Sequence, residues 1–426
     1  MIALMFILMI ILLVLGFPMM IPVIAGPIAV LKAYFPMLKT QLLVQPMISG
    51  VRLMSLIAIP MFIFAAGIMT RGKTANRLID LVMSFIQHVR GGSAIATSAA
   101  CTVFGSISGS TQATVVAMGQ PLLPRLIRMG YSSSYSLALI INASDIALLI
   151  PPSIGMIVYG VVTGTSVGEL FIAGIGPGVL VFTMFALYSY LHARIKRIPI
   201  ESKANWSERR RSLRKALPSL GFPIIIIGGI YSGVFSPNEA AGVSILYALI
   251  LELLIYRALK IKDIYSIALE TGVVTAVVFI LIGMGSAFSW LVTFARIPNL
   301  ILPVIFGTEP SALHALVVIT LAYFIACMFI DNIVVIMVVT PILFPIAKQA
   351  GIDPVALGAI VTLQAAIGSA TPPFGCDIFT AIAIFRRPYL EVIRSTPPFV
   401  LILMLASVGL IFFPEIALFL VNLAFR

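Results

Sequence analysis

The chain has 426 residues, of which 61% are hydrophobic and 10% are charged, and its mean hydropathy is +1.14. A soluble domain carries roughly 25% charged residues, so this composition excludes a set of soluble domains and predicts one membrane bundle. The net charge of +12 could suggest nucleic acid, but Lys and Arg gather in short loops between apolar runs, as in the cytoplasmic loops of membrane proteins. We therefore expect no nucleic-acid partner.

Apolar runs of about 20 residues, each long enough to cross a bilayer core, recur from the N-terminus onward. The first has no basic n-region and is expected to be a retained span. We expect segments near 2–17, 20–36, 50–70, 93–118, 134–161, 171–192, 217–235, 239–257, 266–295, 312–347, 355–385 and 398–423. Those at 93–118, 134–161 and 355–385 are rich in small and polar residues, and 312–347 is too long for one crossing.

The densest basic cluster occupies residues 194–215, and a second basic loop occupies 257–262. Two apolar spans separate them, and an even number of crossings returns the chain to the same side. An excess of Lys and Arg marks cytoplasmic segments, so both loops are predicted to be cytoplasmic. The three cysteines lie in apolar surroundings and are expected to be buried small hydrophobic residues.

The chain contains an internal repeat. The run from Thr111 to Pro121 matches the run from Asp331 to Pro341 at an offset of 220 residues. Residues 128–153 match a later stretch of the chain at an offset of about 221 residues. The second alignment places Gly130 on Gly351 and Pro151-Pro152 on Pro372-Pro373. Repeated Gly- and Pro-interrupted segments are typical of secondary transporters, often with inverted halves, and such pairs point to the binding site near the midplane.

Four interrupted segments, 104–114, 142–153, 329–335 and 366–375, combine small residues with hydroxyl, amide or carboxyl oxygens. Broken helices survive at membrane depth only inside protein or beside a water-filled cavity. Their unwound carbonyls and side-chain oxygens suit a hard cation such as Na⁺, and half-helix N-termini suit an anion. For any single Ser or Gly, close helix packing is the simpler explanation. The matching positions of all four segments favour a site.

Charged residues inside spans are costly, so each needs a functional or structural reason. Asp331 is predicted to serve an ion or proton site, with a buried hydrogen-bonding Asp as the alternative. Asp145 is expected either to hold a cation or to bond to nearby backbone. Asp377 and Glu239 are expected to be structural. Arg296 is expected to extend to the interface, with contact to a substrate anion as the alternative.

Seven stretches have a specific order and spacing from about residue 50 to the C-terminus: FGSISGS (104–110), LLIPPSIGMIVYG (148–160), ELFIAGIGPG (169–178), GGIYSGVFSPNEAA (228–241), MFIDNIVVIMVVTPILFPIA (328–347), GIDPVALG (351–358) and IGSATPPFG (367–375). In these stretches the chain resembles the large membrane subunit (DctM type) of tripartite ATP-independent periplasmic (TRAP) transporters.

The resemblance implies an all-α polytopic membrane protein with two inverted repeats, two re-entrant helical hairpins, and elevator-type transport and scaffold regions. Residues 1–193 would form the N-terminal repeat, with the first hairpin near 93–120. Residues 194–263 would form the basic linker and two connecting spans. Residues 264–426 would form the C-terminal repeat, with the second hairpin near 326–347.

The implied function is sodium-coupled uptake of a small organic anion, a carboxylate or sulfonate, across a bacterial inner membrane. The implied partners are a small four-span membrane subunit, a periplasmic substrate-binding protein and membrane lipid, with no cofactor besides Na⁺ as coupling ion. The sequence does not choose among dicarboxylate, sialic acid, keto acid and sulfonate. Asp145 and the pair Thr111-Gln112 depart from the family pattern and suggest a branch away from C4-dicarboxylates.

Carried onto this sequence, the resemblance gives two hairpin tips, two unwound helices and, by repeat symmetry, two sodium sites. The sodium-site candidates are Ser106, Ser108, Gly109, Ser110, Asn142, Ser144, Asp145, Asp331, Asn332, Gly368, Ser369 and Thr371. The substrate-site candidates are Ser110, Thr111, Pro152, Ser153, Arg296, Asp331 and Pro373.

The alternative within the same class is an autonomous ion-coupled anion transporter that needs no binding protein. An intramembrane enzyme is not expected, because the chain has no HExxH motif and its three histidines are scattered near span ends. A channel is not expected either, because the repeat carries broken segments instead of a symmetric pore motif.

Overall fold

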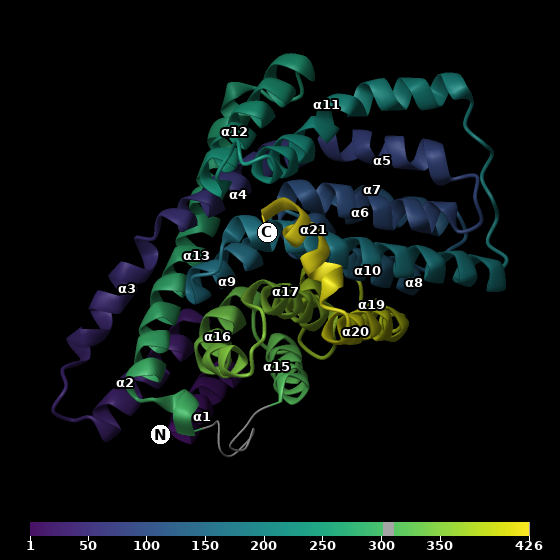
Figure 1. Ribbon diagram of the computed structural model, residues 1–426. Helices are drawn as coiled ribbons and strands as arrows, with labels where there is room; N and C mark the ends of the chain where they lie inside the picture. Colours follow the sequence, from purple (N-terminus) through teal and green to yellow (C-terminus); the bar gives the residue numbers. More distant parts are fainter. Residues whose placement is uncertain (301–310, 426) are drawn as a thin grey trace.

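The computed structural model describes residues 1–300 and 311–425, and within these ranges the regular structure is helical throughout (Figure 1). The N-terminal helices are α1 (Ile2–Val14), α2 (Met20–Tyr34), α3 (Val44–Val51), α4 (Ala58–Arg71) and α5 (Thr74–Ile86), with 3₁₀ turns at Thr40–Leu43 and Met54–Ile57. The next group is α6 (Gly92–Ser108), α7 (Thr111–Arg128), α8 (Ser133–Ser144), the 3₁₀ turn η3 (Asp145–Leu148), α9 (Ile154–Thr163) and α10 (Val167–Ile195).

The middle of the chain forms α11 (Trp206–Tyr231), α12 (Pro237–Leu249), the π-helical turn η4 (Ile250–Ile255) and α13 (Ile261–Phe294). The C-terminal group is α15 (Ala312–Cys327), α16 (Asn332–Gln349), α17 (Pro354–Ala370), α18 (Cys376–Phe385), α19 (Tyr389–Ile393), α20 (Pro397–Phe412) and α21 (Glu415–Phe425). Each of the four predicted interruptions coincides with a break between two helices or turns.

Among the described residues, six helices are long and apolar enough to cross a membrane, or seven if the pair α20 and α21, bent by 55°, forms one span. The six are Met54–Arg71, Val167–Ile195, Trp206–Tyr231, Pro237–Ile255, Ile261–Phe294 and Asn332–Gln349. Lengths of 18 to 34 residues fit an apolar core about 30 Å thick at 1.5 Å per residue. The protein is therefore a polytopic helical membrane protein, as predicted.

The helices divide into two groups (Figure 1). The long helix α13 packs against α2, α3 and α4, and α4 packs against α12, so these elements form a layer along one side. Helices α6 to α10 and α15 to α21 form the other group, which contains the four interruptions. Contacts between α13 and α16 and between α4 and α6 join the two groups.

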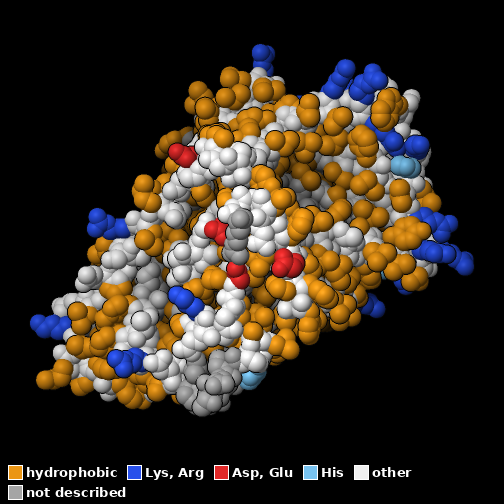
Figure 2. All heavy atoms as spheres, in the orientation of Figure 1, with side chains coloured by type: hydrophobic (Ala, Val, Ile, Leu, Met, Phe, Trp, Pro, Cys, Tyr) orange, Lys and Arg blue, Asp and Glu red, His pale blue; other side chains and the backbone are white. Residues whose placement is uncertain are grey.

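The surface agrees with a membrane environment. Figure 2 shows hydrophobic side chains over most of one face, with Lys and Arg gathered toward its edges. The two basic loops lie at the same end of the molecule. Their junction is visible in a hydrogen bond of 3.0 Å, which the hydroxyl of Tyr256, just before the second loop, donates to the carbonyl of Lys215 in the first. The Arg77 guanidinium adds to this junction by donating to the same carbonyl at 2.9 Å.

The repeat is visible in the helix caps, which also correct its register. Ser110 caps α7 and Asp331 caps α16, while Ser132 caps α8 and Asp353 caps α17. In each pair the second position is the first plus 221, so the offset of 220 assigned to the hairpins is one residue short. The shorter offset arises because α7 and α16 each contain two prolines, and it pairs Pro121 with Pro341, whereas the caps pair Pro124 with Pro345.

Both predicted hairpins are helix pairs with packed arms. Helices α6 and α7 span 92–128, and α15 and α16 span 312–349, so the second pair begins well before the expected range of 326–347. Segment 312–347 thus contains two helices, which explains why it is too long for one crossing.

Candidate functional site

The tip of the first hairpin is a two-residue turn between α6 and α7. Gly109 has φ +61°, and an added Cβ there would meet the Pro152 carbonyl oxygen. The Ser110 side chain caps α7 by accepting from the Ala113 amide at 3.4 Å. The Ser108 and Thr114 hydroxyls lie 2.7 Å apart, and Thr114 also donates to the Ser110 carbonyl at 2.9 Å. This tip concentrates hydroxyl and carbonyl oxygens beside the break between α8 and α9.

The break after α8 runs through η3 and the cis bond Pro151-Pro152 to Ser153, which caps α9 by accepting from the Met156 amide at 3.3 Å. Ser144 donates to the Ile140 carbonyl at 2.7 Å and keeps its lone pairs for another ligand. The Asn142 side-chain amide donates to the Ala138 carbonyl at 2.8 Å, but its side-chain oxygen is buried and has no hydrogen-bond partner among the described residues.

The second half repeats this arrangement. Asp331 caps α16 by accepting from the Ile333 amide at 3.0 Å, and Asn332 is the buried first residue of that helix. Gly368, near the end of α17, fits against Cys327 at the end of α15, so an added Cβ would meet the Cys327 backbone at 2.7 Å. The second hairpin tip therefore lies beside the break between α17 and α18, as the first lies beside that between α8 and α9.

The break between α17 and α18 also contains a cis Pro-Pro bond. Ser369 donates to the Ala365 carbonyl at 2.9 Å, and Thr371 donates to the Ile367 carbonyl at 2.5 Å. Pro373 is exposed, and its carbonyl accepts from the Tyr389 hydroxyl at 2.9 Å. As at Ser144, the two hydroxyl oxygens retain acceptor capacity.

One contact joins the two halves at the centre of this region. The Thr111 hydroxyl, in the first turn of α7, donates to an Asp377 carboxyl oxygen in α18 at 2.8 Å. The Asp377 carboxyl group adjoins that of Asp145, and Asp331 is close enough to interact electrostatically with it. Residues at or next to all four interrupted segments therefore converge on this cluster.

The carboxylates of this cluster lack counter-charges. Among the described residues, both Asp145 oxygens and the second Asp377 oxygen are buried and receive no hydrogen bond from outside the pair, although the two carboxyl groups are within hydrogen-bonding reach of each other. Within residues 1–300 and 311–425, none of the three carboxylates forms an ion pair with Lys, Arg or His. The same ranges contain no group of three or more His, Cys, Asp and Glu arranged to hold a metal ion. The arrangement instead offers hydrogen-bond acceptors to a cationic or donor-rich ligand.

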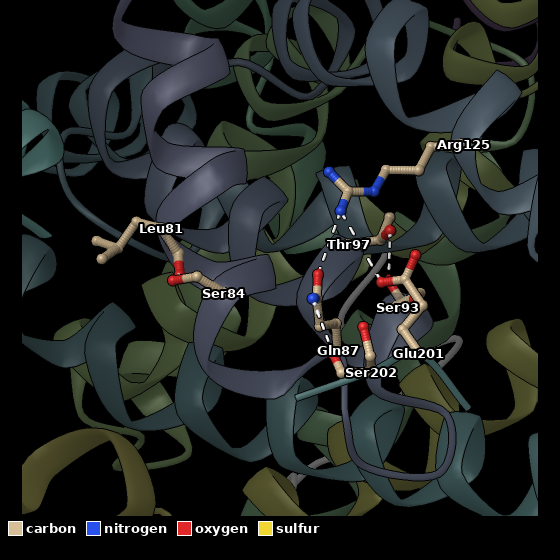
Figure 3. Close-up of polar contacts among 8 residues, drawn as sticks. All are labelled: Leu81, Ser84, Gln87, Ser93, Thr97, Arg125, Glu201 and Ser202. Atoms are coloured by element: carbon tan, nitrogen blue, oxygen red, sulfur yellow. Dashed lines mark hydrogen bonds and ion pairs between the residues drawn. The ribbon is translucent and has the colours of Figure 1, made fainter. Parts of the chain in front are cut away.

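The base of the first hairpin is held by a polar network at the basic end of the molecule (Figure 3). Arg125 in α7 reaches the Gln87 side-chain oxygen at 3.4 Å and the Glu201 carboxylate at 4.0 Å. Gln87 in turn donates to the Ser202 carbonyl at 3.2 Å. Thus the segment between α10 and α11 crosses the hairpin base, far along the hairpin from its Ser110 tip.

Not every predicted residue lies at the tips. Ser106 donates to the Val103 carbonyl at 2.6 Å one turn before the first tip. Arg296 lies exposed after α13 with φ +50°, and among the described residues it makes no hydrogen bond or ion pair with the tips. The structure also adds residues that the sequence did not select, Gln112 and Cys376, whose side chains adjoin each other.

Asp377 was expected to be structural, and the structure places it at the centre of the cluster. A usable signal was present, because an acidic residue inside an apolar helix is by default a functional-site candidate. Its proximity to Asp145 had no sequence signal, since the two positions are not equivalent in the repeat.

Comparison with known proteins assigns the family. The family model described as the DctM component of the tripartite ATP-independent periplasmic transporter matches residues 6–416. The chain belongs to this family. DctM-family proteins are transporter permeases, so this chain is a membrane component of a tripartite transporter and not an enzyme.

Several curated relatives cover nearly the whole chain. The ectoine/5-hydroxyectoine TRAP transporter large permease protein UehC of Ruegeria pomeroyi is 59% identical, over 99% of this chain and 98% of its own. The ectoine TRAP transporter large permease protein TeaC of Halomonas elongata is also 59% identical, over 97% of each chain. The C4-dicarboxylate TRAP transporter large permease protein DctM of Pseudomonas aeruginosa is 37% identical over 86% of each chain.

A solved structure supports the fold. The YdaH transporter of Alcanivorax borkumensis superposes with a TM-score of 0.62, covering 91% of this chain and 90% of that one, at 16% identity. At that identity the likeness concerns the fold alone.

Proposed function

We propose that this protein is the large membrane subunit of a TRAP transporter that takes up an ectoine-type compatible solute, coupled to sodium. The observation that carries the substrate class is the 59% identity, over nearly the full chain, to two permeases named for ectoine. Ectoine is a zwitterion in which a cyclic amidinium is joined to a carboxylate. Its carboxylate belongs to the class predicted from the sequence, and its amidinium lies outside that class.

The departures at Asp145 and Thr111 support this substrate class. An added buried acid is costly beside a dianionic substrate, whereas a substrate that carries a positive group offsets it. Both departures lie in the cluster where the two halves meet.

Sodium coupling is part of the proposal and is supported by the chemistry of the tips. Ser108, Ser110 and the Gly109 carbonyl supply neutral oxygens at the first tip, and Gly368, Ser369 and Thr371 supply them at the second break. Such oxygens are the usual ligands of alkali cations in membrane proteins. Because a zwitterion has no net charge, each sodium ion makes uptake electrogenic and contributes about 2.3 kcal/mol per 100 mV.

The proposed partners are a small four-span membrane subunit and a periplasmic binding protein, and the proposed location is the bacterial inner membrane. The basic loops at 194–215 and 257–262 would face the cytoplasm. We further propose that the helix group containing both hairpins moves as an elevator against the layer formed around α13.

Reconstitution tests this proposal. Proteoliposomes that contain both membrane subunits should take up labelled ectoine when a sodium gradient and the substrate-loaded binding protein are present. Replacing Na⁺ with K⁺ should abolish uptake, and Ser110→Ala or Asp331→Ala should raise the sodium concentration needed for half-maximal rate. Full-rate uptake without a binding protein would instead establish the autonomous alternative. Uptake that is indifferent to sodium would contradict the coupling.

A further inference from the structure

The acidic cluster between the two halves consists mainly of acceptors. Asp145 is 1% exposed, and Asn142 and Asp377 are fully buried. Within the described residues, both Asp145 oxygens and one Asp377 oxygen receive no hydrogen bond from outside the acid pair, and the side-chain oxygen of Asn142, three residues before Asp145, is also without a partner. Thr111 supplies one donor, to the remaining Asp377 oxygen. An unsatisfied buried polar group is destabilising, and an ionised one more so, so the cluster favours a ligand that brings donors.

The ligand must also bring positive charge. Two adjoining carboxylates repel each other in a low-dielectric interior, and in the described part of the chain no Lys, Arg or His forms an ion pair with them. A delocalised planar cation with in-plane N–H groups is the partner that carboxylates bind best, as arginine does in proteins. An amidinium has both properties, because its charge is shared by two nitrogens that each carry N–H bonds.

We propose that Asp145 and Asp377 form the subsite for the amidinium end of the substrate, with the hairpin tip at Thr111 closing over it. This inference rests on the proposed function, since it needs a substrate that carries such a group. Ser110 and Gln112, the chain neighbours of Thr111, and Cys376, the chain neighbour of Asp377, are all partly exposed. Opening the Thr111 contact gives a ligand access to the carboxylates without unfolding a helix.

A sodium ion is the competing occupant, and the chemistry of the tips argues against it at this position. Neutral hydroxyl and carbonyl oxygens are concentrated at Ser108, Ser110 and Ser369, where they suit an alkali cation. The acid pair differs because it places two carboxyl groups, one from each half of the molecule, side by side in the interior. That combination distinguishes a zwitterion from a dicarboxylate, which it would repel.

The test uses the complete transporter in proteoliposomes, with labelled ectoine delivered by the binding protein. Asp145→Asn and Asp377→Asn keep the side-chain shape and remove one charge each. We expect each to lower the maximal uptake rate at least tenfold, with the half-saturating sodium concentration within twofold of wild type. Asp263→Asn is the matched control, because Asp263 caps α13 through the Lys260 amide at 2.7 Å, on the other helix group, and should stay within twofold of wild type.

The outcomes separate the two proposals. A wild-type rate in either site variant, or a normal maximal rate with a raised sodium requirement, overturns the amidinium subsite. Absence of ectoine uptake by the wild-type complex contradicts the proposed function, whatever the variants do.

Co-purification with the small subunit and thermal stability in detergent show whether each variant assembles. If a variant fails to assemble, a second measurement on the wild-type complex tests the subsite. Excess acetamidinium should slow wild-type ectoine uptake, whereas neutral acetamide should not, at concentrations that leave ectoine bound to the isolated binding protein. Equal effects of the two compounds, or none from either, would overturn the subsite.

Discussion

Glu252 and Asp145 are both buried carboxylates in an apolar helical protein, and their surroundings are opposite. Glu252, in η4, accepts from the Lys73 amide at 3.0 Å, from the Thr74 amide at 3.1 Å and from the Thr74 hydroxyl at 2.6 Å. It thereby satisfies the N-terminal turn of α5, whose positive end favours an anion. Asp145 is equally buried, but in the described part of the chain no amide or hydroxyl donates to its oxygens, and the group beside them is the Asp377 carboxyl.

The number of hydrogen-bond donors around each carboxylate distinguishes a structural acid, Glu252, from a candidate ligand-binding acid, Asp145. Removing a carboxylate with a full set of donors leaves those donors unsatisfied. Removing one without donors relieves an uncompensated charge. Burial alone therefore does not identify a functional acid at membrane depth, whereas burial combined with missing partners does.

The largest expected effect is on the scaffold side of this comparison. Glu252→Ala orphans two amides and a hydroxyl, so it should lower the free energy of unfolding by about 3 kcal/mol or more. The measurement is thermal unfolding of the purified protein in detergent. Asp145→Asn, measured in parallel, should leave the midpoint unchanged or raise it. A larger loss from Asp145→Asn than from Glu252→Ala would reverse the assignment of roles.

A smaller effect is expected at the contact that links the halves. Thr111→Val keeps the side-chain shape but removes the hydroxyl that donates to Asp377. One such bond is worth about 1 kcal/mol, so the uptake rate should fall roughly fivefold. Thr111→Ser keeps the donor and should retain at least half of the wild-type rate. Equal losses in the two variants would show that the methyl packing matters and the hydrogen bond does not.

The smallest effect is expected at the base of the first hairpin. Arg125 and Glu201 are separated by 4.0 Å and their side chains are 26% and 24% exposed. Partly exposed ion pairs of this kind contribute about 0.2–1 kcal/mol. Arg125→Ala should therefore shift thermal stability by at most a few degrees and leave ectoine uptake within twofold of wild type. A tenfold loss of uptake would instead give the crossing segment 196–205 a part in transport.

Much of the architecture followed from sequence because the bilayer restricts the possibilities. Apolar length predicted helical segments along the chain, but among the described residues only six of the helices, or seven with the bent pair, are long and apolar enough to cross a membrane. Gly, Pro and hydroxyl residues predicted all four breaks, since backbone can leave the helix at membrane depth only where other protein groups receive it. The order of these breaks along the chain also indicated the internal repeat and the family resemblance. Its register was off by one in the hairpins, because proline matches outweighed the capping positions that set the helix starts.

For the candidate site, the sequence predicted some of the residues but not their contacts. Sequence selected Ser108, Ser110 and Asp331 because their residue types are unusual in local context. Arg296 was selected on the same grounds, and the structure leaves it exposed after α13. The neighbours of each residue come from contacts between distant segments, such as the 266 positions that separate Thr111 from Asp377, and local pattern does not record them.

By itself, the sequence determined that this is a helical membrane transporter component with paired broken segments, because hydrophobic length and backbone satisfaction are properties of each segment alone. Only the tertiary structure decided which buried acids have partners. Glu252 meets the start of α5 and is satisfied, while Asp145 meets Asp377 and is not. The reason is physical: the cost of a buried charge depends on what other parts of the chain bring to it.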